Sequence, residues 1–181
     1  MELVHKIDNA ILEFIQIRIS SKILDYLMPY ITHLGSGGVI WIAVALAFLS
    51  SEPNQTNGLL LINSLLLCVL IGNIILKPLF ARNRPCDINS TIRLLIPKPS
   101  DFSFPSGHTM SSFAAATTIF YVNHRLGIIA FLIALLIAFS RLYLYVHYPT
   151  DILAGLVLGI LVSILSIWLQ DYIIVVLGSK L

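Results

Sequence analysis

Apolar stretches of similar length follow one another along most of the chain, with short polar segments between them. A helix that crosses a membrane needs about 20 mostly apolar residues. Five stretches approach this length, and we expect each of them to form a membrane-spanning helix. Their approximate bounds are Leu34–Leu49, Leu59–Leu76, Thr109–Val122, Leu126–Phe139 and onward, and Ile152–Leu169. The pattern predicts an all-α fold, a polytopic membrane helix bundle.

The N-terminal segment has a different pattern. Apolar side chains recur there at helical spacing, while charged side chains fill the other face. A helix of this kind is typical of segments that lie in the membrane interface. A sixth, weakly hydrophobic span is the alternative. The apolar positions are Leu3, Ile7, Ala10, Ile11, Phe14 and Ile15.

The connections between the predicted spans determine which helix ends meet. Three connections are short, at about residues 51–58, 122–127 and 147–151, and one is long, at residues 77–108. Because consecutive spans cross in opposite directions, the ends of the second and fourth spans share one membrane face with the starts of the third and fifth. The chain shows no internal repeat, and we interpret residues 1–181 as a single domain.

The composition agrees with an integral membrane protein. Hydrophobic residues make up 57% of the chain and charged residues 11%, against roughly 25% charged residues in ordinary soluble domains. The net charge of +2, with basic residues scattered singly, excludes a nucleic-acid partner. Cys68 lies deep in the second span and Cys86 in the long connection, so we expect no disulfide between them. The N-terminal segment lacks the pattern of a signal peptide.

Ionisable residues gather at the four helix ends that share a face. A charge at membrane depth costs about 3 kcal/mol or more unless it faces a polar cavity and finds a partner, so such residues usually mark function. Arg141 is the strongest case, because it interrupts the apolar run FLIALLIAFSRLYLYVHY. Taken alone, Lys77 and Arg82 fit interface anchors better. The full set is Lys77, Arg82, Arg84, His108, Arg141, His147 and Asp151.

Together these residues suit a phosphoryl group. Arginine binds phosphate oxygens in a bidentate manner, and lysine adds a point charge. In the sequence FPSGH, the backbone N–H groups around Ser106 and Gly107 open a predicted helix, and a helix N-terminus favours an anion. Gly107 lacks a side chain and so permits close approach of a ligand to the backbone. The cations expected to bind phosphate are Lys77, Arg84 and Arg141.

The two histidines of the set fit a two-step phosphoryl transfer. One histidine attacks phosphorus through an unprotonated nitrogen, and the other donates a proton to the leaving oxygen. His147 lies four residues before Asp151, whose carboxylate can hold the ring in one tautomer. We therefore predict His147 as nucleophile, Asp151 as its orienting partner and His108 as acid. The three cations stabilise the transition state, and neither a cofactor nor a metal ion is expected.

Three signatures resemble those of the type 2 phosphatidic acid phosphatase (PAP2) superfamily, membrane lipid phosphatases that share a core with vanadium haloperoxidases. KPLFARNRP matches a lysine, six residues and Arg-Pro; FPSGH matches Pro-Ser-Gly-His; SRLYLYVHYPTD matches Ser-Arg, five residues, a histidine, three residues and an aspartate. The match covers residues 77–151. The resemblance implies catalytic roles for His147, His108 and Asp151, and phosphate binding by Lys77, Arg84, Ser106, Gly107 and Arg141. Outside the signatures, and expected only at the entrance, are Arg82, Asp87, Arg93 and Lys98.

The resemblance implies a lipid phosphate or pyrophosphate substrate in the bilayer. We expect undecaprenyl pyrophosphate, because the short chain resembles compact bacterial forms that handle polyprenyl pyrophosphates, and because three further cations, Arg82, Arg93 and Lys98, could hold a second phosphate. Phosphatidylglycerophosphate, phosphatidic acid and a lipid A phosphate are the alternatives.

Readings from other classes fit less well. A small membrane transporter would spread polar groups along a path through the helices, whereas here they collect at one face. A vanadate-dependent peroxidase of this superfamily would be soluble, which disagrees with the hydropathy. A purely structural membrane protein leaves Arg141 unexplained.

Two arguments about sidedness in the cell membrane conflict. Apart from the three phosphate-binding cations, the site face carries Lys6, Arg18, Lys22, Arg82, Arg93 and Lys98, and the opposite face carries Arg125 and Lys180. The positive-inside rule would place the site in the cytoplasm. However, entrance cations attract phosphate and so distort this count, and the enzymes that the chain resembles mostly work on the outer face. We expect an extracytoplasmic site and a C-terminus inside the cell.

Overall fold

The computed structural model describes residues 2–178, and every regular element in that range is helical, as predicted. The α-helices are α1 (Glu2–Phe14), α2 (Lys22–Gly35), α3 (Val39–Leu49), α4 (Gln55–Cys68), α5 (Lys77–Phe80), α6 (Pro85–Ile88), α7 (Gly107–Val122), α8 (His124–Tyr143) and α9 (Pro149–Gly178). Two π-helical segments, η1 (Ile15–Ile19) and η4 (Val69–Leu76), and two short 3-10 segments, η2 (Ser36–Gly38) and η3 (Glu52–Asn54), join them.

Four of the five predicted spans fall in helical stretches that are long and apolar enough to cross a membrane. Among the described residues these stretches are Lys22–Leu49, Glu52–Ile88, His124–Tyr143 and Pro149–Ile173. The third predicted span corresponds to α7, which has 16 residues. At 1.5 Å per residue it is about 24 Å long, shorter than the roughly 30 Å hydrocarbon core of a bilayer.

The first span begins earlier than predicted. The expected start was Leu34, but α2 begins at Lys22 and continues through η2 into α3 as one bent stretch. At the bend, Gly37 and Gly38 have φ values of 60° and 69°, a left-handed conformation that glycine adopts at little cost. Polar residues lower the hydropathy of α2, which is why the apolar pattern alone missed this half of the helix.

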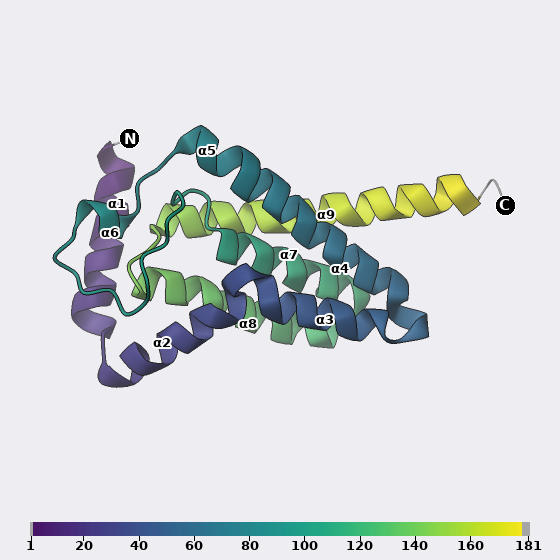
Figure 1. The fold of residues 1–181 in the computed structure, drawn as a ribbon, viewed down its shortest axis with the longest axis horizontal. Helices are drawn as coiled ribbons and strands as arrows, with labels where there is room; N and C mark the ends of the chain where they lie inside the picture. Colours follow the sequence, from purple (N-terminus) through teal and green to yellow (C-terminus); the bar gives the residue numbers. More distant parts are fainter. Residues whose placement is uncertain (1, 179–181) are drawn as a thin grey trace.

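The short helix α7 is the centre of the bundle. Figure 1 shows α3, α4, α8 and α9 running beside it, and direct contacts join α7 to α4, α8 and α9. Alanines 114–116 are fully buried. On α9, Gly155 and Gly159 face α7, and a methyl group at Gly159 would come within 2.4 Å of the carbonyl oxygen of Met110. Small residues four positions apart allow two membrane helices to approach closely in this way.

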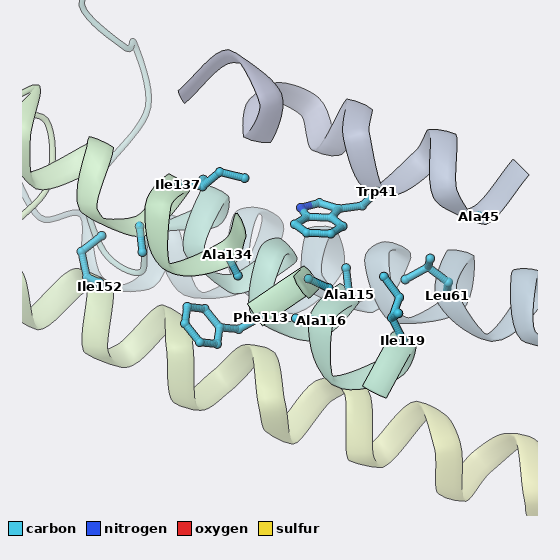
Figure 2. Close-up of a cluster of buried hydrophobic side chains, with 12 residues drawn as sticks. Trp41, Ala45, Leu61, Phe113, Ala115, Ala116, Ile119, Ala134, Ile137 and Ile152 are labelled. Atoms are coloured by element: carbon cyan, nitrogen blue, oxygen red, sulfur yellow. The ribbon is translucent and has the colours of Figure 1, made fainter. Parts of the chain in front are cut away.

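A cluster of apolar side chains fills the space between the helices. Trp41 of α3, Leu61 of α4, Phe113 of α7 and Ile137 of α8 belong to it (Figure 2). The indole Nε1 of Trp41 donates a hydrogen bond to Ser112 Oγ at 3.0 Å, so its polar atom is satisfied inside the bundle. This core holds the helix ends that carry the ionisable residues in fixed positions.

Helix α1 lies across one end of the bundle, next to α6 and the long loop before α7 (Figure 1). It is the predicted amphipathic helix, but the face packed on the protein is narrow and centred on Asp8 and Leu12. Much of the predicted apolar face stays exposed, with Leu3 at 70%, Ile7 at 51% and Phe14 at 58%. An exposed apolar face at the end of a membrane bundle is suited to lipid.

Candidate active site

A cavity of about 250 Å³ is lined by side chains from several parts of the chain. These parts are α2, α5, the segments on either side of α6, the start of α7, and the end of α8 with the turn that follows it. The convergence predicted from the alternation of spans is therefore observed. Of the predicted site residues, the cavity is lined by Lys77, Arg84, Gly107, His108, Arg141 and His147.

Two of the cations share an aspartate that lies outside the predicted set of site residues. Lys77 forms an ion pair with Asp101 Oδ2, and Arg84 Nη2 donates to Asp101 Oδ1 at 2.7 Å. The Lys77 and Arg84 side chains are 8% and 2% exposed, and the Asp101 side chain is 52% exposed. The half-exposed carboxylate of Asp101 thus forms ion pairs with Lys77 and Arg84, two of the cations that were predicted to bind phosphate.

The electrostatics of Asp101 follow from this position. Burial acts to raise its pKa, but the hydrogen bond and charge of Lys77, together with the charge of Arg84, outweigh burial and lower the pKa to about 2. Asp101 is therefore ionised at neutral pH. Its position directly before FSFPSGH was the available signal, because it places an anion a few residues from the phosphate-binding signature.

Arg141 reaches the cavity from the last turn of α8. Its Nη1 donates to Thr32 Oγ1 at 2.6 Å, and the residue is 3% exposed. Its Nε is buried and has no hydrogen-bond partner among the described residues. A buried donor of this kind normally has an acceptor, so Arg141 is ready to bind an oxygen atom of a ligand in the cavity.

His147 lies between a cation and a carboxylate. Its Nε2 is 3.0 Å from Arg84 Nη1, and its Nδ1 is 3.5 Å from Asp151 Oδ2. The side chain is 2% exposed. Burial, followed by the positive charges of Arg84 and Arg141, lowers the pKa of His147 well below its ordinary value. The imidazole is therefore neutral at pH 7, as a nucleophilic nitrogen requires.

His108 is the predicted general acid. It lies in the first turn of α7, lines the cavity, and its Nε2 is 3.3 Å from Ser36 Oγ. Ser36 comes from the bend between α2 and α3, which the sequence analysis left outside the site. The neighbouring hydroxyl gives the His108 ring a fixed orientation.

Ser106 has a different role from the predicted one. Its backbone N–H donates to the carbonyl of Asp151 at 3.2 Å, and its hydroxyl interacts with Thr109 Oγ1 at 2.9 Å. Ser106 is fully buried and does not line the cavity. It caps α7 and joins this helix to α9, so the residues of the signature FPSGH that line the cavity are Gly107 and His108.

Asp151 is fully buried and accepts three hydrogen bonds. Its Oδ2 accepts from Ser103 Oγ and, at 2.8 Å, from the backbone N–H of Tyr148. Its Oδ1 accepts from Arg82 Nη1 at 2.6 Å. These bonds fix the carboxylate on the Nδ1 side of His147, 3.5 Å from a nitrogen that has no hydrogen-bond partner among the described residues.

The cations expected at the entrance lie elsewhere. Arg82 is engaged with Asp151 and with Asp8 of α1. Lys98 pairs with Asp87 at 2.5 Å, and Arg93 lines a separate cavity near Tyr143. The prediction that Arg82, Arg93 and Lys98 could hold a second phosphate in this cavity is therefore wrong, because each has its own place outside the described cavity lining.

Three further lining residues are outside the predicted set of site residues, and two of them precede Leu34, the expected start of the first span. They are Thr32 and His33 of α2 and Ser36 of η2. No motif marks them, and the packing of α2 against α8 brings Thr32 to Arg141. Both cysteines, Cys68 and Cys86, are free and buried, as expected.

The sequence profile of the PAP2 superfamily matches residues 57–174. An undecaprenyl-diphosphatase of Sulfolobus acidocaldarius is 31% identical over 149 residues, covering 82% of this chain and 71% of that protein. The undecaprenyl-diphosphatase BcrC of Bacillus subtilis is 28% identical over 151 residues, covering 83% and 77%. The crystal structure of a transmembrane PAP2 type phosphatidylglycerolphosphate phosphatase from Bacillus subtilis has a TM-score of 0.78 and 29% identity, covering 96% of this chain and 89% of that chain.

The helix bundle with histidines and cations around one cavity agrees with the membrane phosphatases to which the chain is similar. The chain belongs to the PAP2 superfamily. This membership, together with the fold, favours an enzyme over the transporter alternative. The chain is accordingly a membrane hydrolase of phosphoric-ester or diphosphate bonds.

Proposed function

We propose that this protein hydrolyses a polyprenyl pyrophosphate, such as undecaprenyl pyrophosphate, to the monophosphate and inorganic phosphate through a phosphohistidine at His147. The observation that carries the proposal is the convergence of two histidines and three cations on one small cavity. The substrate class is supported by the two undecaprenyl-diphosphatases to which the chain is similar.

In the first step, Nε2 of His147 attacks the terminal phosphorus, and the bond from phosphorus to the bridging oxygen breaks. His108 donates a proton to that oxygen as the polyprenyl monophosphate leaves. Arg84 Nη1, which lies 3.0 Å from Nε2 before substrate binds, transfers its hydrogen bond to a phosphoryl oxygen. Arg141, through its free Nε, binds a second oxygen as charge develops in the transition state.

In the second step, a water molecule attacks the phosphohistidine. His108, which is now neutral, accepts a proton from this water, and the bond between phosphorus and Nε2 breaks to release inorganic phosphate. Asp151 stabilises the Nδ1–H tautomer of His147 in both steps, so that the nitrogen facing the cavity keeps its lone pair. The cycle returns both histidines to their starting protonation states.

The same geometry supports a mechanism without a metal ion. Lys77, Arg84 and Arg141 already surround the position of the phosphoryl group with positive charge. We expect phosphate release to continue in EDTA, and we expect orthovanadate, which imitates five-coordinate phosphorus, to inhibit. Complete loss of activity in chelator with recovery on adding Mg²⁺ would contradict this part of the proposal.

A second cavity supports a lipid substrate. Its volume is about 440 Å³, and it shares Lys77, Asp101, Gly107 and His108 with the first cavity. The rest of its lining includes the polar residues Asn73 and Ser111 and a group of apolar side chains of α3, α4 and η4, namely Ile42, Ile62, Leu65, Leu66 and Val69. A hydrocarbon chain attached to a phosphate at His108 therefore has an apolar site next to it, between two membrane helices.

The preference for a pyrophosphate rests on the leaving group. A phosphate-bearing leaving group has a low pKa and demands less of His108 than the alkoxide of a monoester does. The main alternative is a phosphatidylglycerophosphate phosphatase, which the similarity to the Bacillus subtilis crystal structure favours. Both substrates use the same site and the same two steps.

A panel of lipids tests the substrate assignment. The purified protein is assayed for phosphate release from undecaprenyl pyrophosphate, a shorter prenyl pyrophosphate, phosphatidylglycerophosphate, phosphatidic acid and a lipid A phosphate. We expect the highest kcat/KM with the prenyl pyrophosphates. Higher values with phosphatidylglycerophosphate would overturn this substrate assignment and leave the enzyme class intact.

We propose that the site faces the outside of the cell, with the C-terminus inside. The support is the resemblance to enzymes of the outer face, together with the partners of Arg82 and Lys98, which show that part of the basic charge on the site face neutralises local carboxylates. A cysteine label near the C-terminus tests this assignment. We choose position 180, where Lys180 lies outside the described residues. Labelling of a cysteine at position 180 by an impermeant reagent in intact cells would reverse this assignment.

A further inference from the structure

The N-terminal helix contributes a buried carboxylate to the structure behind the proposed nucleophile. Asp8 of α1 is fully buried. Its Oδ1 accepts from the backbone N–H of Thr150 at 3.0 Å, and its Oδ2 accepts from the Thr150 hydroxyl at 2.6 Å and from Arg82 Nη2 at 2.7 Å. A buried charge is tolerated only when it is paired and hydrogen-bonded, and these three bonds meet that requirement.

One guanidinium joins this carboxylate to the partner of His147. Arg82 Nη1 donates to Asp151 Oδ1 at 2.6 Å and to Thr150 Oγ1 at 2.7 Å, while Nη2 donates to Asp8. The guanidinium carbon lies 4.0 Å from the centre of the Tyr148 ring, which restricts its position further. Arg82 thus divides its charge between Asp8 and Asp151.

Apolar packing holds α1 against the segment that carries His147. Leu12 and Ile15 belong to the same buried cluster as Tyr145, Val146 and Tyr148. Tyr145 has a φ of 59°, a left-handed conformation that residues other than glycine rarely adopt. The turn before α9 therefore depends on surrounding contacts for its shape, and Leu12 of α1 and Ile15 of η1 belong to the cluster that surrounds it.

We infer that Asp8 and Arg82 are positioning residues that hold the Asp151 carboxylate in place beside His147, so that α1 forms part of the active site. This inference rests on the function proposed above. With Asp8 in place, the guanidinium is drawn from both sides, and Asp151 stays 3.5 Å from Nδ1 of His147. Without the Asp8 charge, Arg82 pairs with Asp151 alone and competes with His147 for that carboxylate.

The test uses Asp8→Asn, which keeps the shape of the side chain and removes its charge. The full-length protein is mixed, in saturating excess, with a prenyl pyrophosphate labelled in the terminal phosphate, and a single turnover is followed. Under these conditions the rate constant does not depend on the fraction of molecules that are correctly folded. We expect the single-turnover rate constant to fall about tenfold, as for one charged pair within a connected network. In steady-state assays, KM should stay within about twofold of wild type.

A double-mutant comparison separates positioning from a general loss of stability. In an Arg82→Gln background, Asp8→Asn should cause no further decrease, because the guanidinium that links Asp8 to Asp151 is already absent. The matched control is Glu13→Gln, on an exposed position of the same helix, which should behave as wild type.

The possible outcomes separate this inference from the proposed function. An unchanged single-turnover rate constant in Asp8→Asn, or fully additive losses in the double variant, would overturn the inference while the wild-type enzyme still turned over. A wild-type protein that released phosphate from no lipid in the panel would overturn the proposed function and the inference with it.

Discussion

Two buried polar regions of the bundle, one charged and one neutral, are built in different ways. At the α1 end, Asp8, Arg82 and Asp151 come from three separate parts of the chain and complete one another. Between α4, α7 and α9, Thr118 Oγ1 lies 3.0 Å from Ser64 Oγ and 2.9 Å from Ser163 Oγ. The first region surrounds the proposed site, and the second lies along the helices.

The difference between the two regions is where each polar group finds its partner. Ser64 and Thr118 each also donate to the carbonyl four residues earlier in their own helix, at 3.0 Å in both cases. Such hydroxyls keep a partner even when a neighbouring helix changes. The charged side chains of the first region find most of their partners in distant segments, because Arg82 pairs with both Asp8 and Asp151. A change in the charged region therefore affects segments that are far apart in the sequence. We therefore expect activity to depend on the charged region and the neutral region to contribute only stability.

His147→Ala should have the largest effect. No other nucleophile of the signatures lies beside the three cations, so turnover and the phosphoenzyme should both fall by about 10³-fold or more, as for the loss of other catalytic nucleophiles. The measurements are phosphate release and acid-quench trapping of the labelled protein. Activity at the wild-type level in this variant would refute the mechanism.

His108→Ala should have a large effect that depends on the leaving group. Loss of a general acid typically costs about 10²–10⁴-fold. We expect the loss to be greater for phosphatidic acid, which releases an alkoxide, than for a prenyl pyrophosphate, which releases a phosphate. Comparison of kcat for the two substrates checks this, and equal losses would argue against His108 as the acid.

Asp101→Asn should strengthen binding of anions. In the wild type the carboxylate occupies Lys77 and Arg84, so an entering phosphoryl group must compete with it. A half-exposed ion pair is worth about 1 kcal/mol or less, so the inhibition constant for orthovanadate should fall up to about fivefold. Because the pKa of Asp101 is about 2, the carboxylate is charged at all higher pH values. The difference between variant and wild type should therefore stay constant between about pH 5 and pH 8; an inhibition constant that rises would show that Asp101 assists binding.

Thr118→Val should have the smallest effect. It removes the hydroxyl that contacts Ser64 and Ser163, and Ser64 retains the carbonyl of Leu60 as an acceptor in its own helix. Hydrogen bonds between membrane helices average about 0.6 kcal/mol, so unfolding in mixed micelles should require slightly less denaturant. Phosphate release should remain at the wild-type rate. A large loss of activity would show that the two polar regions are coupled.

Much of the site could be predicted from the sequence because its residues have short-range signals. The spacing in KPLFARNRP, FPSGH and SRLYLYVHYPTD marks Lys77, Gly107 and His147, and the alternation of apolar spans brings these segments to one face. Hydropathy also predicted the helices α3, α4, α8 and α9, because long apolar runs have few other stable structures in a membrane.

Other features were decided by tertiary packing alone. Asp8 looks like one more charge on the polar side of an amphipathic helix, and only its position across the bundle turns it toward Arg82. In the same way α2 has too low a hydropathy to be recognised, yet its packing on α8 brings Thr32 to Arg141. The physical reason is that a pattern along the chain reports the average surroundings of a segment, whereas the partner of a buried charge is selected by distances between segments far apart in the sequence.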